Sequence, residues 1–221
     1  VQACTDLMKT FVFWKQTFPA SSFVTNLSGS MVLKSISVIA VLLVLFLRIN
    51  DRKSFFLVKG DLQAKASTIK WLGIDGDRIG WGKLALISGI LISSVTFVAT
   101  ILTVTGFKMP NNIGNYVRML PIILLFAFLN SLFEGIVYRN GILGTLSKLL
   151  SKEEALLVGA FIFGIGHYYG APGGIVGALM STLLGWYMGR SMLETKGMAS
   201  AWLIHFMQDV VIFSAFFLFT F

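Results

Sequence analysis

Cysteine, histidine and charged side chains are scarce in this chain. Among 221 residues there are one cysteine and two histidines, and only 13% of the residues are charged. A single cysteine, Cys4, excludes a disulfide framework and any zinc site built from cysteine ligands. The low charge, together with a hydrophobic share of 56%, excludes an ordinary soluble domain of this size. The composition therefore predicts an all-α, polytopic membrane protein.

Acidic side chains are also few, with 10 Asp and Glu against 18 Lys and Arg, which gives a formal net charge of +8. A basic balance is often associated with nucleic-acid binding. Here the basic residues cluster between apolar segments, where membrane topology explains them. We therefore expect no nucleic-acid partner and a chain that lies in the lipid bilayer.

Six apolar segments are expected to cross the membrane and to form a helix bundle, since about 20 apolar residues span a bilayer. Residues 1–28 precede them as an interfacial segment or part of a helix, and residues 29–221 form the membrane-embedded domain. A further helix upstream is left open. The six segments are Ser30–Leu47, Leu84–Gly106, Arg118–Leu146, Ala155–Tyr168, Ile175–Arg190 and Met198–Phe221.

The distribution of basic residues predicts the orientation of the chain. The segment Arg48–Lys83 holds eight Lys and Arg residues, whereas the turn Tyr168–Gly174 holds none. Because cytoplasmic loops carry an excess of Lys and Arg, the Arg48–Lys83 loop is predicted to be cytoplasmic, and its tryptophans Trp71 and Trp81 are typical of a membrane interface. We expect a multi-pass protein of the cell membrane in a bacterium or archaeon, or of the endoplasmic reticulum in a eukaryote.

Ionisable side chains interrupt three of the apolar segments. Glu134 lies in the third segment, and the only two histidines, His167 and His205, lie in apolar runs. An ionisable group at the bilayer centre costs roughly 2.5 to 3.5 kcal/mol on translocon scales, so it persists where it has partners and usually a function. Asp209 follows His205 by four residues, so these two share one helix face.

Each of these side chains has a structural as well as a functional interpretation. Glu134 is either a buried carboxylate paired with a cation or a general base that takes a proton from water. Arg139 lies five positions later, about 140° around an α-helix, so the two are not expected to stack and each would find partners on other helices. His167 alone is more often bonded to a carbonyl, and His205 with Asp209 is a local pair that joins helices.

Together, these side chains match the inventory for activating water. The two imidazoles and one of the carboxylates could hold a zinc ion, with the other carboxylate as the base. Without a metal, Glu134 and one histidine could activate water while the other histidine and Asp209 polarise the carbonyl and stabilise the oxyanion. Both arrangements are hydrolytic, and the residues alone leave both open.

Three motifs carry a family resemblance. Glu134 begins a Glu-Gly-x-x-x-Arg motif, Phe163 begins Phe-x-x-x-His, and His205 begins His-x-x-x-Asp. Their order and helix placement resemble the Glu-Glu-x-x-x-Arg, Phe-x-x-x-His and His-x-x-x-Asn/Asp motifs of the CAAX protease and bacteriocin-processing family of intramembrane proteases, also called the Abi family or CAAX prenyl protease type 2. The resemblance covers about residues 71–221. One position departs, because Gly135 stands where the family has its second glutamate.

The resemblance implies a role for each motif residue. Glu134 would activate water with help from His167, and His205 and Asp209 would stabilise the oxyanion or complete a metal site. Arg139 would orient the surroundings of Glu134 or a substrate carboxylate. The family's metalloprotease label implies zinc, for which the ligands would be His167, His205 and Asp209, although a metal-free, glutamate-dependent mechanism fits the same residues. The substrate would be a membrane-associated peptide or lipidated protein, such as a prenylated C-terminus, a bacteriocin leader or a pro-peptide.

Two other functions are weighed against an intramembrane endopeptidase. The missing glutamate at Gly135 favours a catalytically inactive membrane scaffold or bacteriocin-immunity protein of the same fold. A small transporter would use Glu134 and the histidines as a proton relay, but the sequence lacks the inverted repeat that many transporters carry. The sequence leaves the oligomeric state open, and the protease is the function that we expect.

Overall fold

The computed structural model describes residues 7–49, 51–102, 109–110, 112–170 and 173–220. Within these residues the chain is helical and has no β-strand, only two isolated bridges in the segment before α4. The all-α fold predicted from the composition is therefore confirmed. Cys4, Pro172 and the end of the second expected segment, residues 103–106, lie outside the described residues.

Each of the six expected segments corresponds to a helix. The first helix begins earlier than expected, at Phe23 rather than Ser30, and the third is continuous from Ile113 to Leu146 although its hydrogen-bonding pattern changes along its length. In chain order the helices are α2 (Val12–Thr17), α3 (Phe23–Arg48), η1 (Lys70–Leu72), α4 (Trp81–Thr100), α5 (Ile113–Glu134), η3 (Gly135–Leu143), α6 (Gly144–Leu146), α7 (Lys152–Ile165), α8 (Gly174–Thr195) and α9 (Ala199–Phe219).

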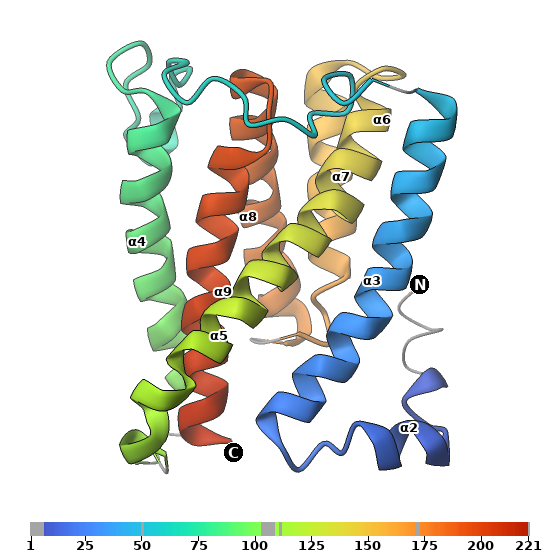
Figure 1. Cartoon of the computed structure of the whole chain (residues 1–221). Coiled ribbons are helices and arrows are strands. Elements are labelled where there is room, and N and C mark those ends of the chain that lie inside the picture. The colour runs from blue at the N-terminus through green and yellow to red at the C-terminus, as the bar shows by residue number, and fades with distance from the viewer. Residues whose placement is uncertain (1–6, 50, 103–108, 111, 171–172, 221) are drawn as a thin grey trace.

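Among the residues that the structure describes, four helical stretches are long and apolar enough to cross a membrane, namely Phe23–Arg48, Trp81–Thr100, Ile113–Leu146 and Ala199–Phe219. Helix α7 has only 14 residues, which is short of the roughly 20 that span a bilayer. Helix α8 has 22 residues but mixes glycine, serine and threonine among its apolar side chains. Helices α7 and α8 pack against each other inside the same bundle (Figure 1). The protein is thus an integral membrane protein with a polytopic helical fold.

Helix α9 holds the bundle together, because it packs against α4, α5 and α8 (Figure 1). Helix α3 packs against α5 and η3, and η3 also packs against α7. One buried apolar cluster, around Trp81 and Met188, joins α4, α8 and α9, and a second, around Phe23 and Phe126, joins α3, α5 and α9. The polar groups described below lie where α3, α5, α7 and α9 meet.

The segment between α3 and α4, residues 51–80, crosses one end of the bundle (Figure 1) and is bonded to it. The backbone N–H groups of Met198 and Ala199 donate to the carbonyls of Val58 and Lys59, at 2.9 and 3.2 Å. Beside them the backbones of Gly60 and Gly197 pass so close that a Cβ on Gly197 would lie 2.2 Å from the Gly60 nitrogen. This crossing admits only glycine and fixes the loop to the start of α9.

The two tryptophans of this loop region have different surroundings. Trp71 is 65% exposed, as expected of a residue at a membrane interface, but Trp81 is fully buried. The indole N–H of Trp81 donates to Oε2 of Glu194 at 2.7 Å, which satisfies its one polar group inside the protein. The prediction of an interfacial Trp81 is therefore wrong.

Helix α7 begins with a capping box. The Ser151 hydroxyl accepts from the backbone N–H of Glu154 at 3.4 Å, and the Glu154 carboxylate accepts from the backbone N–H of Ser151 at 3.0 Å. The Ser151 hydroxyl also donates to this carboxylate, which lowers the pKa of Glu154 below its usual value. The box satisfies donors that every helix start leaves free and so fixes the start of the helix that ends beside His167.

Candidate active site

Glu134 stands where the helix changes its geometry. It is the last residue of α5, and the chain continues from Gly135 to Leu143 as the π-helix η3. In a π-helix the hydrogen bonds join residues five positions apart, so Arg139 returns to the side of the helix that carries Glu134. Even so, no ion pair joins them among the described residues, and each finds its partners on other helices, as the sequence analysis expects. Such π segments inside α-helices are frequent at functional sites.

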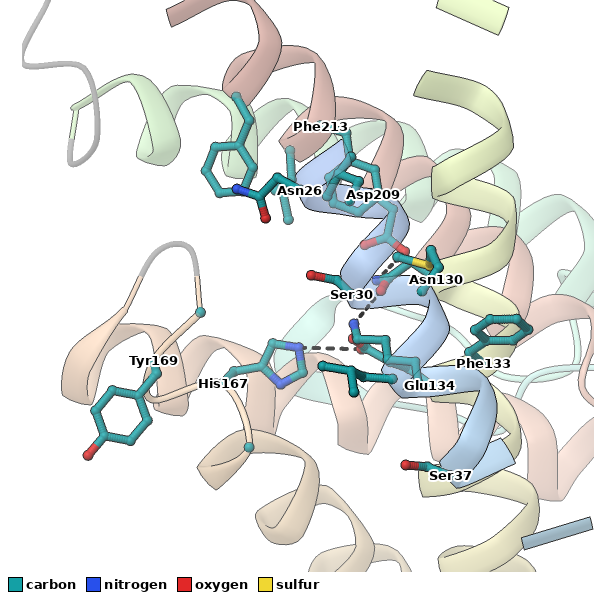
Figure 2. Close-up of a pocket in the computed structure, with 18 of the residues that line it drawn as sticks. Asn26, Ser30, Ser37, Asn130, Phe133, Glu134, His167, Tyr169, Asp209 and Phe213 are labelled. Atoms are coloured by element: carbon teal, nitrogen blue, oxygen red, sulfur yellow. Dashed lines mark hydrogen bonds and ion pairs between the residues drawn. The ribbon is translucent and has the colours of Figure 1, made fainter. Parts of the chain in front are cut away.

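The Glu134 carboxylate is the centre of a polar cluster (Figure 2). Its Oε1 accepts a hydrogen bond from Nζ of Lys34, on α3, at 2.6 Å. Its Oε2 lies 3.6 Å from Nε2 of His167 and 3.5 Å from Nε2 of His205. The side chain is only 13% exposed, and Oε2 has no hydrogen-bond partner among the described residues. A buried oxygen of this kind, with polar groups around it, suits a bound water molecule.

Arg139 fixes the orientation of His205. Its Nη2 lies 2.8 Å from Nδ1 of His205, and both residues are buried, with 4% and 3% exposure. A guanidinium group only donates hydrogen bonds, so Nδ1 is the acceptor and the neutral ring carries its proton on Nε2. That N–H faces Oε2 of Glu134 and, at 3.7 Å, Oδ2 of Asp209. His205 and Asp209, four residues apart on α9, thus lie on one face of the helix beside Glu134, as their spacing in the sequence predicts.

His167 reaches the same carboxylate from the end of α7. Its Nδ1 donates to the backbone carbonyl of Phe163 at 2.8 Å, so in the neutral ring Nε2 is an acceptor. Two acceptors cannot bond to each other, so a neutral His167 leaves both Nε2 and Glu134 Oε2 available to accept hydrogen bonds from a water molecule. The Phe163 ring packs against both histidines, with centroid distances of 4.3 Å to His167 and 5.8 Å to His205.

Asp209 is held by a residue that the sequence analysis missed. Asn130 donates from Nδ2 to Oδ2 of Asp209 at 3.0 Å, and its Oδ1 accepts from Nζ of Lys34. Asn130 lies one helical turn before Glu134, so both project from one face of α5. An ionised Asp209 only accepts hydrogen bonds, and in that state it orients Asn130 and offers no donor to a substrate.

Lys34 and Asn130 both had a signal in the sequence. Lys34 interrupts the apolar segment Ser30–Leu47, and a lysine inside a membrane span indicates a function in the same way as Glu134 does. Asn130 stands four positions before Glu134 in an apolar run, where a shared helix face follows from the spacing. The structure joins all of the predicted site residues with these two.

The expected metal ligands His167, His205 and Asp209 do not fit a zinc ion in this arrangement. Among the described residues, no group of three or more His, Cys, Asp and Glu side chains is placed to hold a metal. A metal-bound histidine normally donates its second N–H to an acceptor, whereas Nδ1 of His205 faces the Arg139 cation. The Lys34 ammonium adds a second positive charge beside Glu134.

The cluster forms one wall of a cavity of about 630 Å³ between α3, α5, α9 and the turn after α7 (Figure 2). The polar wall consists of Lys34, Asn130, Glu134, His167 and Asp209, while Arg139 and His205 stand behind it. A largely apolar cavity with a few converging polar groups is typical of a binding site. The apolar wall is formed by Phe23, Leu27, Met31, Ile212, Phe213 and Phe216.

One protein family matches the part of the chain that carries the three motifs. The family of Rce1-like type II CAAX prenyl endopeptidases matches residues 116–211. This range includes Glu134, His167, His205 and Asp209, so the resemblance predicted from the motifs is confirmed. Comparison with curated proteins and with solved structures gives no significant match.

Proposed function

We propose that this chain, a member of the CAAX protease family of membrane proteases, hydrolyses a peptide bond with Glu134 as the general base. The observation that carries this proposal is the buried Oε2 of Glu134, which has no hydrogen-bond partner within the described part of the chain and faces the Nε2 atoms of His205 and His167 at 3.5 and 3.6 Å. A water molecule bound there can donate one hydrogen to Glu134 and the other to His167 Nε2.

The reaction begins when this water attacks the scissile carbonyl carbon and passes a proton to Glu134 Oε2. The carbonyl oxygen becomes the oxyanion of a tetrahedral intermediate, and the His205 Nε2–H contributes positive potential from behind the cavity wall. When the C–N bond breaks, Glu134 returns the proton to the leaving amine. Arg139 keeps His205 in the tautomer that this step requires, and Asp209 and Asn130 fix its neighbourhood.

The cavity supports a substrate that is apolar on one side of the scissile bond. Its apolar wall, built around Phe23, Met31 and Phe213, adjoins the polar wall at Glu134. A prenyl group or apolar peptide side chains would bury against this wall, which favours the bound state by about 25 cal/mol per Å² of apolar surface. Of the substrates expected from the sequence, a prenylated C-terminus fits this division best.

A metal-free mechanism is part of the proposal because of the charges in the site. Zinc bound at Nε2 of His205 would require Nδ1 to be unprotonated beside the Arg139 cation, without the acceptor that normally orients such a ligand. Two cations, Arg139 and Lys34, already balance the two carboxylates, Glu134 and Asp209. The chemistry of the site therefore favours Glu134 as a base without a metal.

The test measures cleavage of an internally quenched, farnesylated peptide by the purified protein in detergent. The variant Glu134→Gln keeps the shape of the side chain but removes the base, and we expect at least a 10³-fold lower rate, at the upper part of the range for general-base loss. The control Glu153→Gln changes an exposed carboxylate on α7 and should keep the full rate. Treatment with 1,10-phenanthroline should also leave the rate unchanged.

Two results would contradict the proposal in different ways. A Glu134→Gln variant with undiminished turnover would remove Glu134 as the base, and a wild-type protein without cleavage would favour the scaffold or immunity function. Inhibition by 1,10-phenanthroline that added zinc reverses would replace the metal-free mechanism by a metal-dependent one that uses His167, His205 and Asp209.

A further inference from the structure

Lys34 has no role in the three motifs, and it lies outside the matched residues 116–211. It stands in the apolar helix α3, where an ammonium group is costly unless it has partners. Its Nζ contacts Oε1 of Glu134 at 2.6 Å and Oδ1 of Asn130. The side chain lines the cavity and is 36% exposed, so it can reach a bound substrate.

The ammonium group of Lys34 has one hydrogen to spare. It carries three N–H donors, and among the described residues it has two acceptors, on Glu134 and Asn130. The third N–H is therefore free for a group that enters the cavity. The contact with Glu134 also holds this donor beside the carboxylate that we propose to bind the attacking water.

The other N–H donors of the cluster are already used or lie behind the wall. The Nδ1–H of His167 is bonded to a backbone carbonyl, and the Nδ2–H of Asn130 is bonded to Asp209. The Nε2–H of His205 belongs to a ring that is 3% exposed and does not line the cavity. An ionised Asp209 offers no hydrogen at all. Within this cluster, Lys34 therefore holds the N–H donor that is available to an oxyanion in the cavity.

We propose that Lys34 is a further catalytic residue that donates a hydrogen bond to the oxyanion of the tetrahedral intermediate; this inference rests on the hydrolysis proposed above. No covalent bond of Lys34 forms or breaks. As water adds to the carbonyl carbon, the oxygen gains a full negative charge and accepts the third N–H. A cation held in place beside the reacting carbonyl stabilises this charge more than it stabilises the neutral carbonyl of the substrate.

The first experiment separates the effect on the transition state from the effect on binding. The variant Lys34→Met keeps the apolar stem and removes the charge. With the farnesylated quenched peptide, we expect kcat to fall by roughly 10²- to 10³-fold, as for the loss of one oxyanion donor, while KM changes less than about threefold because the ground state loses little. The control Lys15→Met makes the same change at an exposed site on α2 and should have no effect.

A rescue experiment distinguishes catalysis from a purely structural role. In a Cys4→Ser background, Lys34→Cys is treated with 2-bromoethylamine, which rebuilds an ammonium group at nearly the original position. We expect this treatment to recover at least about tenfold in kcat, by the same reasoning of one restored donor, whereas treatment with iodoacetamide should recover nothing. Thermal unfolding of each variant in detergent verifies that it is folded.

The outcomes separate this inference from the proposed function. If Glu134→Gln abolishes cleavage but Lys34→Met keeps its kcat, or raises only KM, the role of Lys34 is overturned and hydrolysis stands. The Tyr138 hydroxyl also lies on the cavity wall. If Tyr138→Phe lowers kcat and Lys34→Met does not, the role of Lys34 is likewise overturned and hydrolysis stands. If the wild type cleaves no peptide, the proposed function fails and this inference fails with it.

Discussion

The two histidines of the site, although they face the same carboxylate oxygen, are built into the molecule in different ways. The His167 side chain is 26% exposed, lines the cavity and is held by one bond to a carbonyl of its own helix. The His205 side chain is 4% exposed, lies behind the cavity wall and receives a bond from Arg139. We therefore expect His167 to exchange protons with water or substrate, and His205 to belong to the buried framework that holds the site.

The variant His167→Ala tests the exposed member of this pair. Removal of a proton-transferring side chain typically costs 10²- to 10⁴-fold in rate, and we expect a loss of about 10³-fold in kcat. The thermal unfolding temperature should change little, because the ring is partly exposed and its Nδ1–H is bonded to a carbonyl one helical turn earlier, that of Phe163. The measurement combines peptide cleavage with thermal unfolding of the purified variant in detergent.

The neighbouring tyrosine provides the control for this prediction. Tyr168 is 44% exposed and does not line the cavity, so Tyr168→Phe should keep both the rate and the unfolding temperature. If His167→Ala instead unfolds at a clearly lower temperature while the remaining folded protein keeps its rate, His167 belongs to the framework and the contrast between the two histidines is not valid.

The variant Arg139→Met tests the buried member of the pair, His205, through the arginine that holds it. It removes the donor to Nδ1 of His205 and leaves a buried acceptor unpaired, which typically costs about 1 to 3 kcal/mol. We expect a lower unfolding temperature together with roughly 10²-fold slower cleavage, since the free ring can adopt the other tautomer and withdraw its N–H from the site. The more conservative variant Arg139→Lys should lose less unfolding temperature and less cleavage rate than Arg139→Met, because an ammonium group can still donate to Nδ1 of His205.

An exposed arginine of the same helical run gives the matched control. Arg118 lies near the start of α5 and is exposed, so Arg118→Met should alter neither quantity. A rate loss for Arg139→Met with an unchanged unfolding temperature would place Arg139 at the substrate and not behind the wall, as the alternative role of binding a substrate carboxylate requires.

Much of this arrangement could be predicted from the sequence, because bilayer insertion leaves a strong pattern. Apolar runs locate all six helices, and the ionisable residues in them, Glu134, His167, His205 and Asp209, meet in one place. The backbone in a membrane must satisfy its own hydrogen bonds, so a long apolar run has almost no alternative to a helix. Partners for buried charges are equally necessary, which is why the charged positions converge.

The geometry within the third span could not be predicted, and this has a physical reason. An apolar run satisfies its backbone hydrogen bonds in a π-helix as well as in an α-helix, so hydropathy does not distinguish the two. The change at Gly135 turns Arg139 toward His205, and it depends on packing by α3, α7 and α9 that no local pattern records. The buried position of Trp81 similarly depends on Glu194, which follows it by more than a hundred residues.

Gly135 allows a test of how the positive charge of Arg139 is balanced by nearby carboxylates. A Cβ at this position would lie 3.3 Å from Nη2 of Arg139, whose Nη1 is buried without a hydrogen-bond partner among the described residues. The family motif has a glutamate here and permits an asparagine at the position of Asp209. The chain thus keeps two carboxylates near Arg139, with the second at Asp209 and not at position 135.

The variants Gly135→Glu and Gly135→Ala should therefore have different effects. Replacing a glycine inside a helix by alanine stabilises it by up to about 1 kcal/mol, partly offset here by the close contact with Arg139. The carboxylate of Gly135→Glu should add a partner for Nη1 of Arg139, but it also places a third negative charge beside Glu134 and Asp209.

We expect the double variant Gly135→Glu/Asp209→Asn to be more stable than Gly135→Glu by on the order of 1 kcal/mol, the size of coupling usual for residues in one network. Thermal unfolding in detergent measures this difference, and equal stability of the two variants would mean that Asp209 does not share Arg139 with position 135.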